Sequence, residues 1–149
     1  MADDTLIALY SEQLLGLAAN SPLTTPLPNP DGVAKERSPL CGSVVSVEIA
    51  LDGDRIAGFH QDVKACALGQ ASAAVFARHA VGLTQTEVAT LRDQMSAMLK
   101  HDGDAPSGKF EDLRFLLAAR GFKNRHDSIL LVFNATLAAF DQAQKKASA

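Results

Sequence analysis

Hydrophobic and polar positions alternate in the first half of the chain in a way that predicts a β-hairpin. Over residues 44–51 every second residue is hydrophobic, the period of a strand with one buried face (Val45, Val47, Ile49 and Leu51). The segment Asp52-Gly53-Asp54 suits a tight turn, and residues 55–62 predict the returning strand. Residues 33–37 predict a short edge strand, so we expect a sheet of three antiparallel strands.

Elsewhere, hydrophobic residues recur at the spacing of a helix. Thr84 and Glu87 match a capping box that opens one of these helices, and Asp127 is a natural N-cap for the last helix. Prolines between residues 20 and 32 predict an extended connector. The predicted helices cover residues 3–19, 66–80, 84–99 and 110–117 and a segment that begins near Asp127. These elements predict an α+β fold, a small three-stranded antiparallel sheet with helices packed on one side.

Composition limits the classes of function. A length of 149 residues suits a single domain spanning residues 1–149. A net charge of −3 argues against nucleic acid as a partner, because no basic stripe is available to neutralise phosphates. No apolar run approaches the roughly 20 residues that span a bilayer, and the acidic start does not look like a signal peptide. We therefore expect a cytoplasmic protein without a membrane partner, whose cysteines are thiols or ligands rather than a disulfide.

The two cysteines of the chain flank the predicted hairpin. Cys41 precedes its first strand, and Cys66 follows its second strand at the start of a helix. An antiparallel hairpin returns both ends to one edge, so we expect the thiols to be neighbours. A helix start favours the thiolate form of Cys66, and a pair of thiolates suits a soft metal. Two inert buried thiols are the simpler interpretation, and a nucleophile pair of Cys66 with His126 is a further alternative.

At these residues the sequence resembles the U-type iron–sulfur cluster assembly scaffolds, the IscU/SufU/NifU N-terminal family. The resemblance rests on Cys41-Gly42-Ser43, on the segment ACALGQASAA over residues 65–74 and on the segment RHDS over residues 125–128. It covers nearly the whole chain and implies a SufE/NifU-like fold. The sequence also departs from the family pattern. The third cysteine of the family falls on Ser128, the aspartate after the first Cys-Gly falls on Ser43, and Asp127 falls where one branch has a metal-binding histidine.

The resemblance implies a scaffold or carrier rather than an enzyme. It implies that Cys41 and Cys66 bind iron, zinc or a [2Fe-2S] cluster, with Asp127 or His126 completing the metal site and Ser43 and Ser128 beside it. It also implies a cysteine desulfurase as sulfur donor, with persulfide on Cys66, and apo iron–sulfur proteins as acceptors. A homodimer in which each chain contributes two thiolates would restore four sulfur ligands.

Two other functions stay open beside the scaffold. The chain could be a persulfide acceptor that passes sulfur on without a stable metal, or a non-catalytic module that regulates the same pathway. Local alternatives exist for single residues too. On local grounds helix capping is the favoured role of Asp127. Ser43 is explained by a strand-start or capping hydroxyl and Ser128 by a first-turn helix position, and His126 is either a surface residue or a ligand.

Overall fold

The computed structural model describes the backbone of residues 2–148 and the side chains of residue 8 and residues 10–148. Its elements are, in chain order, α1 (Ala2–Ala19), β1 (Gly32–Arg37), β2 (Val44–Asp52), β3 (Arg55–Lys64), α2 (Ala67–Arg78), α3 (Gln85–Lys100), the 3-10 helix η1 (Gly108–Ala119) and α4 (Lys123–Ser148). The strands form one antiparallel sheet in the order β1-β2-β3. The predicted α+β fold is therefore confirmed, including the short edge strand.

The hairpin of β2 and β3 sets the geometry of the sheet. Asp52 pairs with Arg55, which leaves a two-residue turn in which Gly53 has a φ of 65°. That positive φ favours glycine. One β-bulge shifts the register next to Ala50. At the other end of the hairpin Val44 pairs with Lys64, so the segments before β2 and after β3 leave the sheet side by side.

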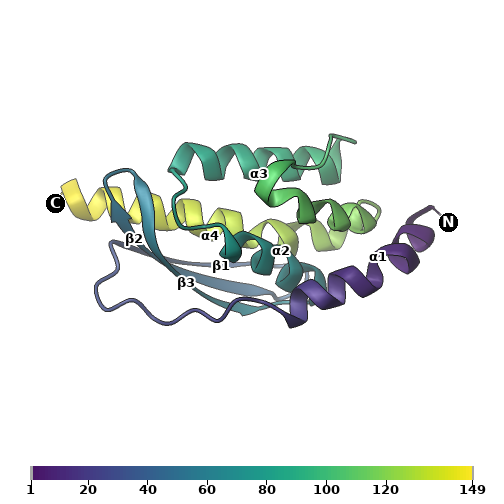
Figure 1. Cartoon of the computed structure of the whole chain (residues 1–149), viewed down its shortest axis with the longest axis horizontal. Coiled ribbons are helices and arrows are strands. Elements are labelled where there is room, and N and C mark those ends of the chain that lie inside the picture. Colours follow the sequence, from purple (N-terminus) through teal and green to yellow (C-terminus); the bar gives the residue numbers. More distant parts are fainter. Residues whose placement is uncertain (1, 149) are drawn as a thin grey trace.

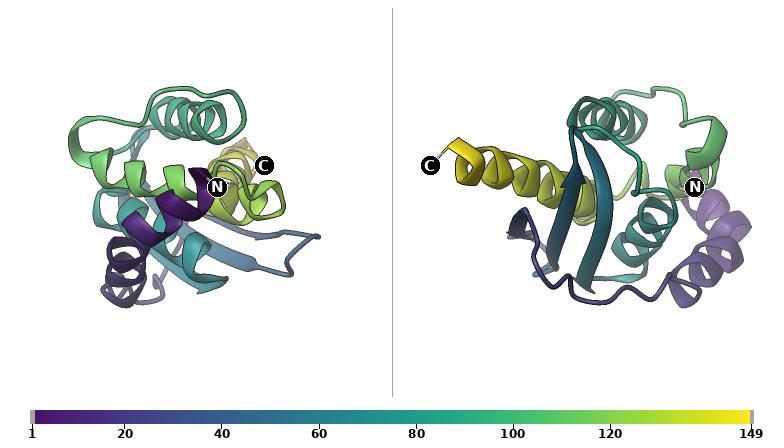
Figure 2. Two further views of the ribbon diagram at one scale, coloured as in Figure 1. Left: turned by 90° about the vertical axis from the view of Figure 1, so that its right-hand side faces the viewer. Right: turned by 60° about the vertical axis from the view of Figure 1, so that its left-hand side comes forward.

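The hydrophobic core lies between one face of the sheet and the helices (Figures 1 and 2). Of the four alternating positions of β2 that the sequence predicted as buried, Val45, Val47 and Ile49 are at most 1% exposed, whereas Leu51, next to the bulge, is only half-buried. Phe76 of α2 and Phe133 of α4 meet edge to face, with ring centroids 5.4 Å apart, an arrangement that aromatic pairs prefer. The core thus fixes α2 and α4 on the same side of the sheet.

The long helix α4 approaches the sheet closely at Gly32 in β1. A Cβ atom at this position would collide with the carbonyl group of Ala139, so only glycine fits here. Further along α4, the side chain of Gln142 accepts a hydrogen bond from the N–H of Val33, at 2.9 Å. The second half of α4 is therefore anchored along β1.

The opposite, outer face of the sheet is covered only in part, by the connector of residues 20–31. The N–H of Leu27 donates to the carboxylate of Glu48 at 2.9 Å, and the Leu27 side chain lies over Gly58. Thr24 contacts the ring of His60 at 2.9 Å between Oγ1 and Nδ1. These contacts cover the half of the outer face nearer the hairpin turn.

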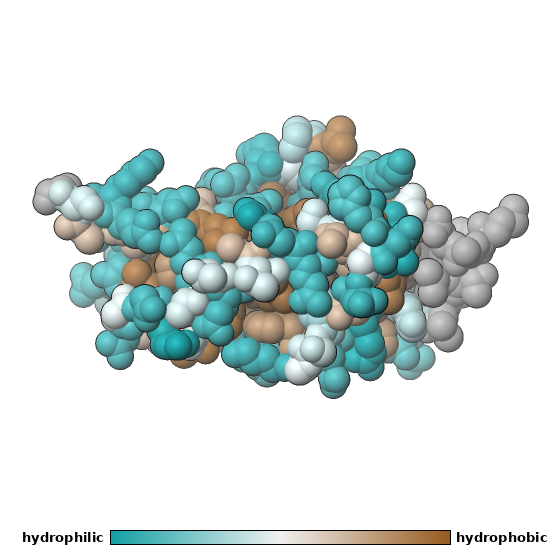
Figure 3. Space-filling view, turned by 90° about the horizontal axis from the view of Figure 1, so that it is seen from above, coloured by the Kyte–Doolittle hydropathy of each residue, from teal (hydrophilic) through white to brown (hydrophobic). Residues whose placement is uncertain are grey.

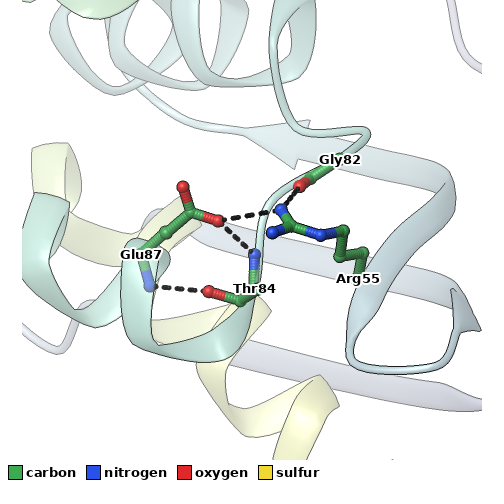
Figure 4. Close-up of polar contacts among 4 residues, drawn as sticks. All are labelled: Arg55, Gly82, Thr84 and Glu87. Atoms are coloured by element: carbon green, nitrogen blue, oxygen red, sulfur yellow. Dashed lines mark hydrogen bonds and ion pairs between the residues drawn. The ribbon is translucent and has the colours of Figure 1, made fainter.

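Beyond the hairpin turn, α3 begins with the predicted capping box (Figure 4). The hydroxyl of Thr84 accepts from the N–H of Glu87 at 3.2 Å, and Glu87 Oε1 accepts from the N–H of Thr84 at 3.0 Å. The backbone N–H of Thr84 also lowers the pKa of the Glu87 carboxyl. Arg55 at the start of β3 donates to the carbonyl of Gly82 at 2.8 Å. The capping box is confirmed, and it joins α3 to the hairpin.

The start of the last helix differs from the prediction. Asp127 was expected to be its N-cap, but α4 begins at Lys123, so Asp127 lies inside the helix and this prediction was wrong. The 3-10 helix η1 leads to the turn at Gly121, where the N–H of Phe122 bonds to the carbonyl of Ala119 at 2.9 Å. Helical hydrogen bonding resumes at once, with the N–H of Arg125 donating to the carbonyl of Phe122. A new helix can therefore begin before the favourable capping residue is reached.

The molecular surface shows no broad apolar region on the side drawn in Figure 3, where hydrophilic residues surround small hydrophobic patches. Among residues 2–148 there is no helix with both the length and the apolar character needed to cross a membrane.

Candidate thiol site

The two cysteines reach the same end of the sheet from different elements. Cys41 lies in the loop between β1 and β2, which is closed by a hydrogen bond of 2.9 Å from the N–H of Gly42 to the carbonyl of Ser38. Cys66 is the N-cap residue of α2, and its side chain makes no hydrogen bond to the helix N–H groups. Both thiols are half-buried. Each sulfur therefore lies near the surface, one in a hydrogen-bonded loop and one at the start of a helix.

Two serine hydroxyls link the two sulfur atoms, and a third, that of Ser38, contacts Cys41 alone. Cys41 Sγ lies 3.3 Å from Ser38 Oγ and 3.2 Å from Ser43 Oγ. Ser43 Oγ is 3.0 Å from Ser128 Oγ, which is 3.6 Å from Cys66 Sγ. The three serines are at most 4% exposed. We call these five residues the thiol–serine cluster, in which buried hydroxyls form a floor and the half-buried sulfurs lie toward solvent.

Ser38 is a member of the cluster that sequence reasoning missed. It is 1% exposed, and it also closes the loop by donating its N–H to the carbonyl of Ser43 at 2.8 Å. The signal available in the sequence was a small polar residue three positions before Cys41, directly after a strand that ends in charged residues. Such a position is typical of a loop closure, but nothing in its spacing indicates a contact with sulfur.

The serines change the acid–base chemistry of Cys41. Burial raises the pKa of its thiol, but hydrogen bonds with the Ser38 and Ser43 hydroxyls, the Ser43 backbone and the Ser128 hydroxyl lower it. The net result is a Cys41 pKa of about 7, compared with an ordinary value of 9.0. Because the thiolate is the nucleophilic and metal-binding form, a large fraction of Cys41 is in its reactive state at neutral pH.

Close packing of α2 against α4 places Ser128 in the cluster. A Cβ atom on Gly69 would lie 2.6 Å from Ser128 Oγ and 2.9 Å from the Cβ of Ala65. One turn further along α2, the hydroxyl of Ser72 donates to the carbonyl of Ile129 at 2.8 Å. The absence of a side chain at Gly69 is therefore what gives the Ser128 hydroxyl its place between the sulfurs.

The structure does not bring Asp127 or His126 to the thiols. Asp127 Oδ1 lies 4.0 Å from the Nζ of Lys100, in a cavity of about 480 Å³ that contains neither cysteine. His126 is 3% exposed, and its Nε2 lies 3.0 Å from the carbonyl oxygens of both Ala119 and Arg120. Successive helical residues point about 100° apart, so Asp127, one position before Ser128, and His126, two positions before it, point in different directions from Ser128. Among the side chains of residues 8 and 10–148, no three His, Cys, Asp or Glu lie close enough together to hold a metal ion.

Comparisons with known proteins identify the family. The sequence matches no family model, and a search of curated proteins also found no match. Among solved structures, the chain is similar to a nitrogen-fixing NifU-like protein (N-terminal) from Brucella abortus, with 40% identity and a TM-score of 0.88. That similarity covers 94% of this chain and 97% of the Brucella chain.

A second solved structure has the same fold at lower identity. It is described as an iron–sulfur cluster assembly scaffold protein for the SUF system from the thermophile Fervidobacterium islandicum, with 19% identity and a TM-score of 0.78. The similarity covers 90% of this chain and 98% of that one. The identity and coverage of the Brucella protein show that the chain belongs to the U-type scaffold family, as a NifU-like N-terminal domain.

Proposed function

We propose that this protein is a scaffold or carrier in iron–sulfur cluster assembly, and that iron or a [2Fe-2S] cluster is its cargo. The observation that carries the proposal is the thiol–serine cluster, in which Cys41 and Cys66 both connect to the buried hydroxyl of Ser128. Membership of the NifU-like family supports the same role. Thiolates are the protein ligands that iron–sulfur clusters require and that zinc also accepts, so zinc is expected to compete for the site.

The number of thiols determines how the cargo is held. One chain offers two sulfurs, and the third position is the hydroxyl of Ser128, which is a poor ligand because it does not ionise at neutral pH. A [2Fe-2S] cluster takes four protein ligands. In our proposal two chains share one cluster, and each contributes Cys41 and Cys66. Completing the site within one chain would require Asp127 to leave Lys100 or His126 to leave its two carbonyl partners.

The proposal is tested by anaerobic reconstitution with ferrous iron, sulfide and a cysteine desulfurase. Visible absorption and the iron-to-protein ratio report loading, and size-exclusion chromatography under argon reports oligomeric state. We expect the wild type to form a cluster and to elute as a dimer only when loaded. Cys41→Ser and Cys66→Ser should each abolish loading, and Asp127→Ala should load normally. Loading that survives either cysteine substitution would overturn the proposal.

A gain-of-function variant provides a matched control for the cysteine losses. Ser128→Cys replaces an oxygen by a sulfur at the point where the two existing thiols converge. We expect this variant to hold iron or zinc within a single chain and to release it to a chelator more slowly than the wild type. Thr84→Ala, at the opposite end of the hairpin, should load as the wild type does. Circular dichroism of each variant confirms that the fold is retained.

A second candidate function is that of a sulfur acceptor. The observation that favours it is the pair of hydroxyl contacts on Cys41, which stabilises a nucleophilic thiolate. In this reaction the Cys41 thiolate attacks the terminal sulfur of a desulfurase persulfide. The S–S bond of the desulfurase breaks, a new S–S bond forms on Cys41, and the desulfurase cysteine leaves as a thiolate. No net oxidation occurs.

Mass spectrometry of the reconstitution samples separates the two candidates. Persulfide on Cys41 without retained iron supports the sulfur acceptor. Iron that depends on both cysteines supports the scaffold. The earlier expectation that Cys66 carries the persulfide is tested by the same measurement, because Cys41→Ser would then keep the modification on Cys66.

A further inference from the structure

The uncovered half of the outer sheet face contains a basic pocket. Its wall is formed by residues on all three strands, with a cavity of about 210 Å³ between them. Arg37, Val44 and Lys64 form one cross-strand row, and Lys35, Ser46 and Asp62 form the next. Residues directly opposite in a sheet point to the same face, so all six side chains lie on the side away from the core. We call them the basic sheet pocket.

The positive charges of this pocket are compensated only in part. Lys35, Arg37 and Lys64 are exposed, and Asp62 is the only acidic residue in the lining. Across the part of the chain whose side chains are described, none of these four residues forms an ion pair. The whole chain has a net charge of −3, so this patch has the opposite sign to the rest of the molecule. Such a patch attracts negatively charged groups.

The fold leaves this pocket accessible. The connector covers the outer face at Gly58 and His60 through Leu27 and Thr24, nearer the hairpin turn. The two rows of the pocket lie beyond those contacts, at the end of the sheet that leads to the cysteines. Arg37 is followed directly by Ser38 of the thiol–serine cluster, and Lys64 lies two positions before Cys66.

We propose that the basic sheet pocket is a docking site for an acidic segment of a partner protein, with one Glu or Asp side chain entering the cavity. The Arg37 guanidinium can bind a carboxylate with two parallel hydrogen bonds. Lys35 and Lys64 add point charges on either side, and Ser46 offers a hydroxyl donor at the floor. A cavity of about 210 Å³ holds one side chain, and three cations are too few for the backbone of a nucleic acid.

This docking site goes beyond the proposed cargo function and does not depend on it, because no residue of the pocket belongs to the thiol–serine cluster. Its position nevertheless has a consequence. A partner that inserts an acidic side chain beside Arg37 and Lys64 is brought next to Cys41 and Cys66. A partner bound at the pocket would therefore already be positioned to reach the thiols.

Fluorescence anisotropy with a labelled polyglutamate peptide, in metal-free buffer at low salt, tests the proposal. Arg37→Gln combined with Lys64→Gln should weaken binding by roughly tenfold, because each exposed ion pair contributes up to about fivefold. Asp62→Asn should strengthen binding by about twofold to fivefold, since it removes the one repulsive charge. Binding to the wild type should weaken steeply with added salt.

The control variant combines Lys109→Gln with Lys145→Gln, which removes the same charge from two exposed positions outside the pocket, one in η1 and one in the last turn of α4. It should bind the peptide as the wild type does. Equal losses in the control and the pocket variant would show attraction by net charge alone and would overturn the proposal. Full displacement of the peptide by equimolar inorganic phosphate, or equal binding of anionic lipid vesicles, would assign the pocket to anions in general and would also overturn it. All substitutions are at exposed positions, and thermal denaturation verifies folding.

Discussion

The two ends of the β2–β3 hairpin both contain polar clusters, and the clusters are built differently. At the turn, Arg55, Thr84 and Glu87 bind one another and nearby backbone groups reciprocally. At the thiol end, the hydroxyl contacts run in one line from sulfur to sulfur and leave both sulfurs half-exposed. In the reciprocal cluster the polar groups stabilise a helix start and already bind one another, so they are not available to bind another molecule. The linear cluster ends in two half-exposed sulfurs, which is the arrangement that the proposed cargo site requires.

The largest effect on stability should come from substitution of Gly69, whose lack of a side chain leaves space for the Ser128 hydroxyl between the sulfurs. Gly69→Ala should lower the free energy of unfolding by about 1–3 kcal/mol, because the added methyl group overpacks the contact between α2 and α4. Gly16→Ala is the matched control within α1, where a Cβ would meet no atom within 4 Å. It should raise stability by up to about 1 kcal/mol through helix propensity. Urea denaturation measures both, and stabilisation by Gly69→Ala would contradict the packing described.

Removal of the Ser43 hydroxyl should show that the thiol–serine cluster lowers the pKa of Cys41. In Ser43→Ala we expect the Cys41 pKa to rise from about 7 toward its ordinary value of 9.0. Thiolate absorbance and iodoacetamide rates across this pH range provide the measurement. A Cys41 pKa that stays near that of the wild type would assign the lowering to other groups.

The lowered pKa of Cys41 in the wild type predicts how the free energy of unfolding depends on pH. The folded-state pKa lies below the unfolded-state value, so the thiolate contributes stability that is complete above pH 9 and is lost as the pH falls through about 7. The free energy of unfolding of the wild type should therefore rise from pH 7 to pH 9, apart from other titrations. The rise should be smaller in Ser43→Ala.

Loss of the cap at the turn should affect stability and leave the thiols unchanged. Thr84→Ala removes the acceptor for the N–H of Glu87 and should cost about 1 kcal/mol. The Cys41 titration curve should coincide with that of the wild type. A shift in that curve would mean that the two ends of the hairpin are coupled.

The smallest effect should come from the ion pair at the turn. Arg55 and Glu87 are 3.4 Å apart, with side chains 59% and 52% exposed. Pairs this exposed contribute little, so Arg55→Lys should change the free energy of unfolding by less than about 0.5 kcal/mol. Denaturation with and without added salt measures the ionic part of this small change.

The hairpin, the edge strand and the capping box could be predicted from the sequence because each rests on local rules. Alternation, turn residues and the Thr84–Glu87 spacing depend on neighbours within a few positions. The side-by-side exit of the segments that contain Cys41 and Cys66 follows from the hairpin itself. These features required no knowledge of how distant elements pack.

The remaining part of the site depends on packing between elements distant in sequence. The place of Ser128 is set by Gly69 of another helix, and the contact of Ser38 with Cys41 is set by a loop closure. The direction of Asp127 depends on where α4 begins. A capping rule placed that start at Asp127, whereas the turn at Gly121 places it at Lys123. A shift of a few residues along a helix changes which side chain faces the sulfurs.

The hydrogen bond between Val33 and Gln142 has a consequence for solubility. The exposed edge of a sheet is a template for pairing with other chains and hence for aggregation. In this protein the last turns of α4 contact the start of the β1 edge, where Gln142 accepts the hydrogen bond of the Val33 N–H, and Lys146 donates to the carbonyl of Pro30, just before β1, at 3.2 Å. We therefore expect the end of α4 to oppose pairing at this edge, and trimming it before Gln142 should produce a protein that aggregates at concentrations at which the complete helix stays in solution.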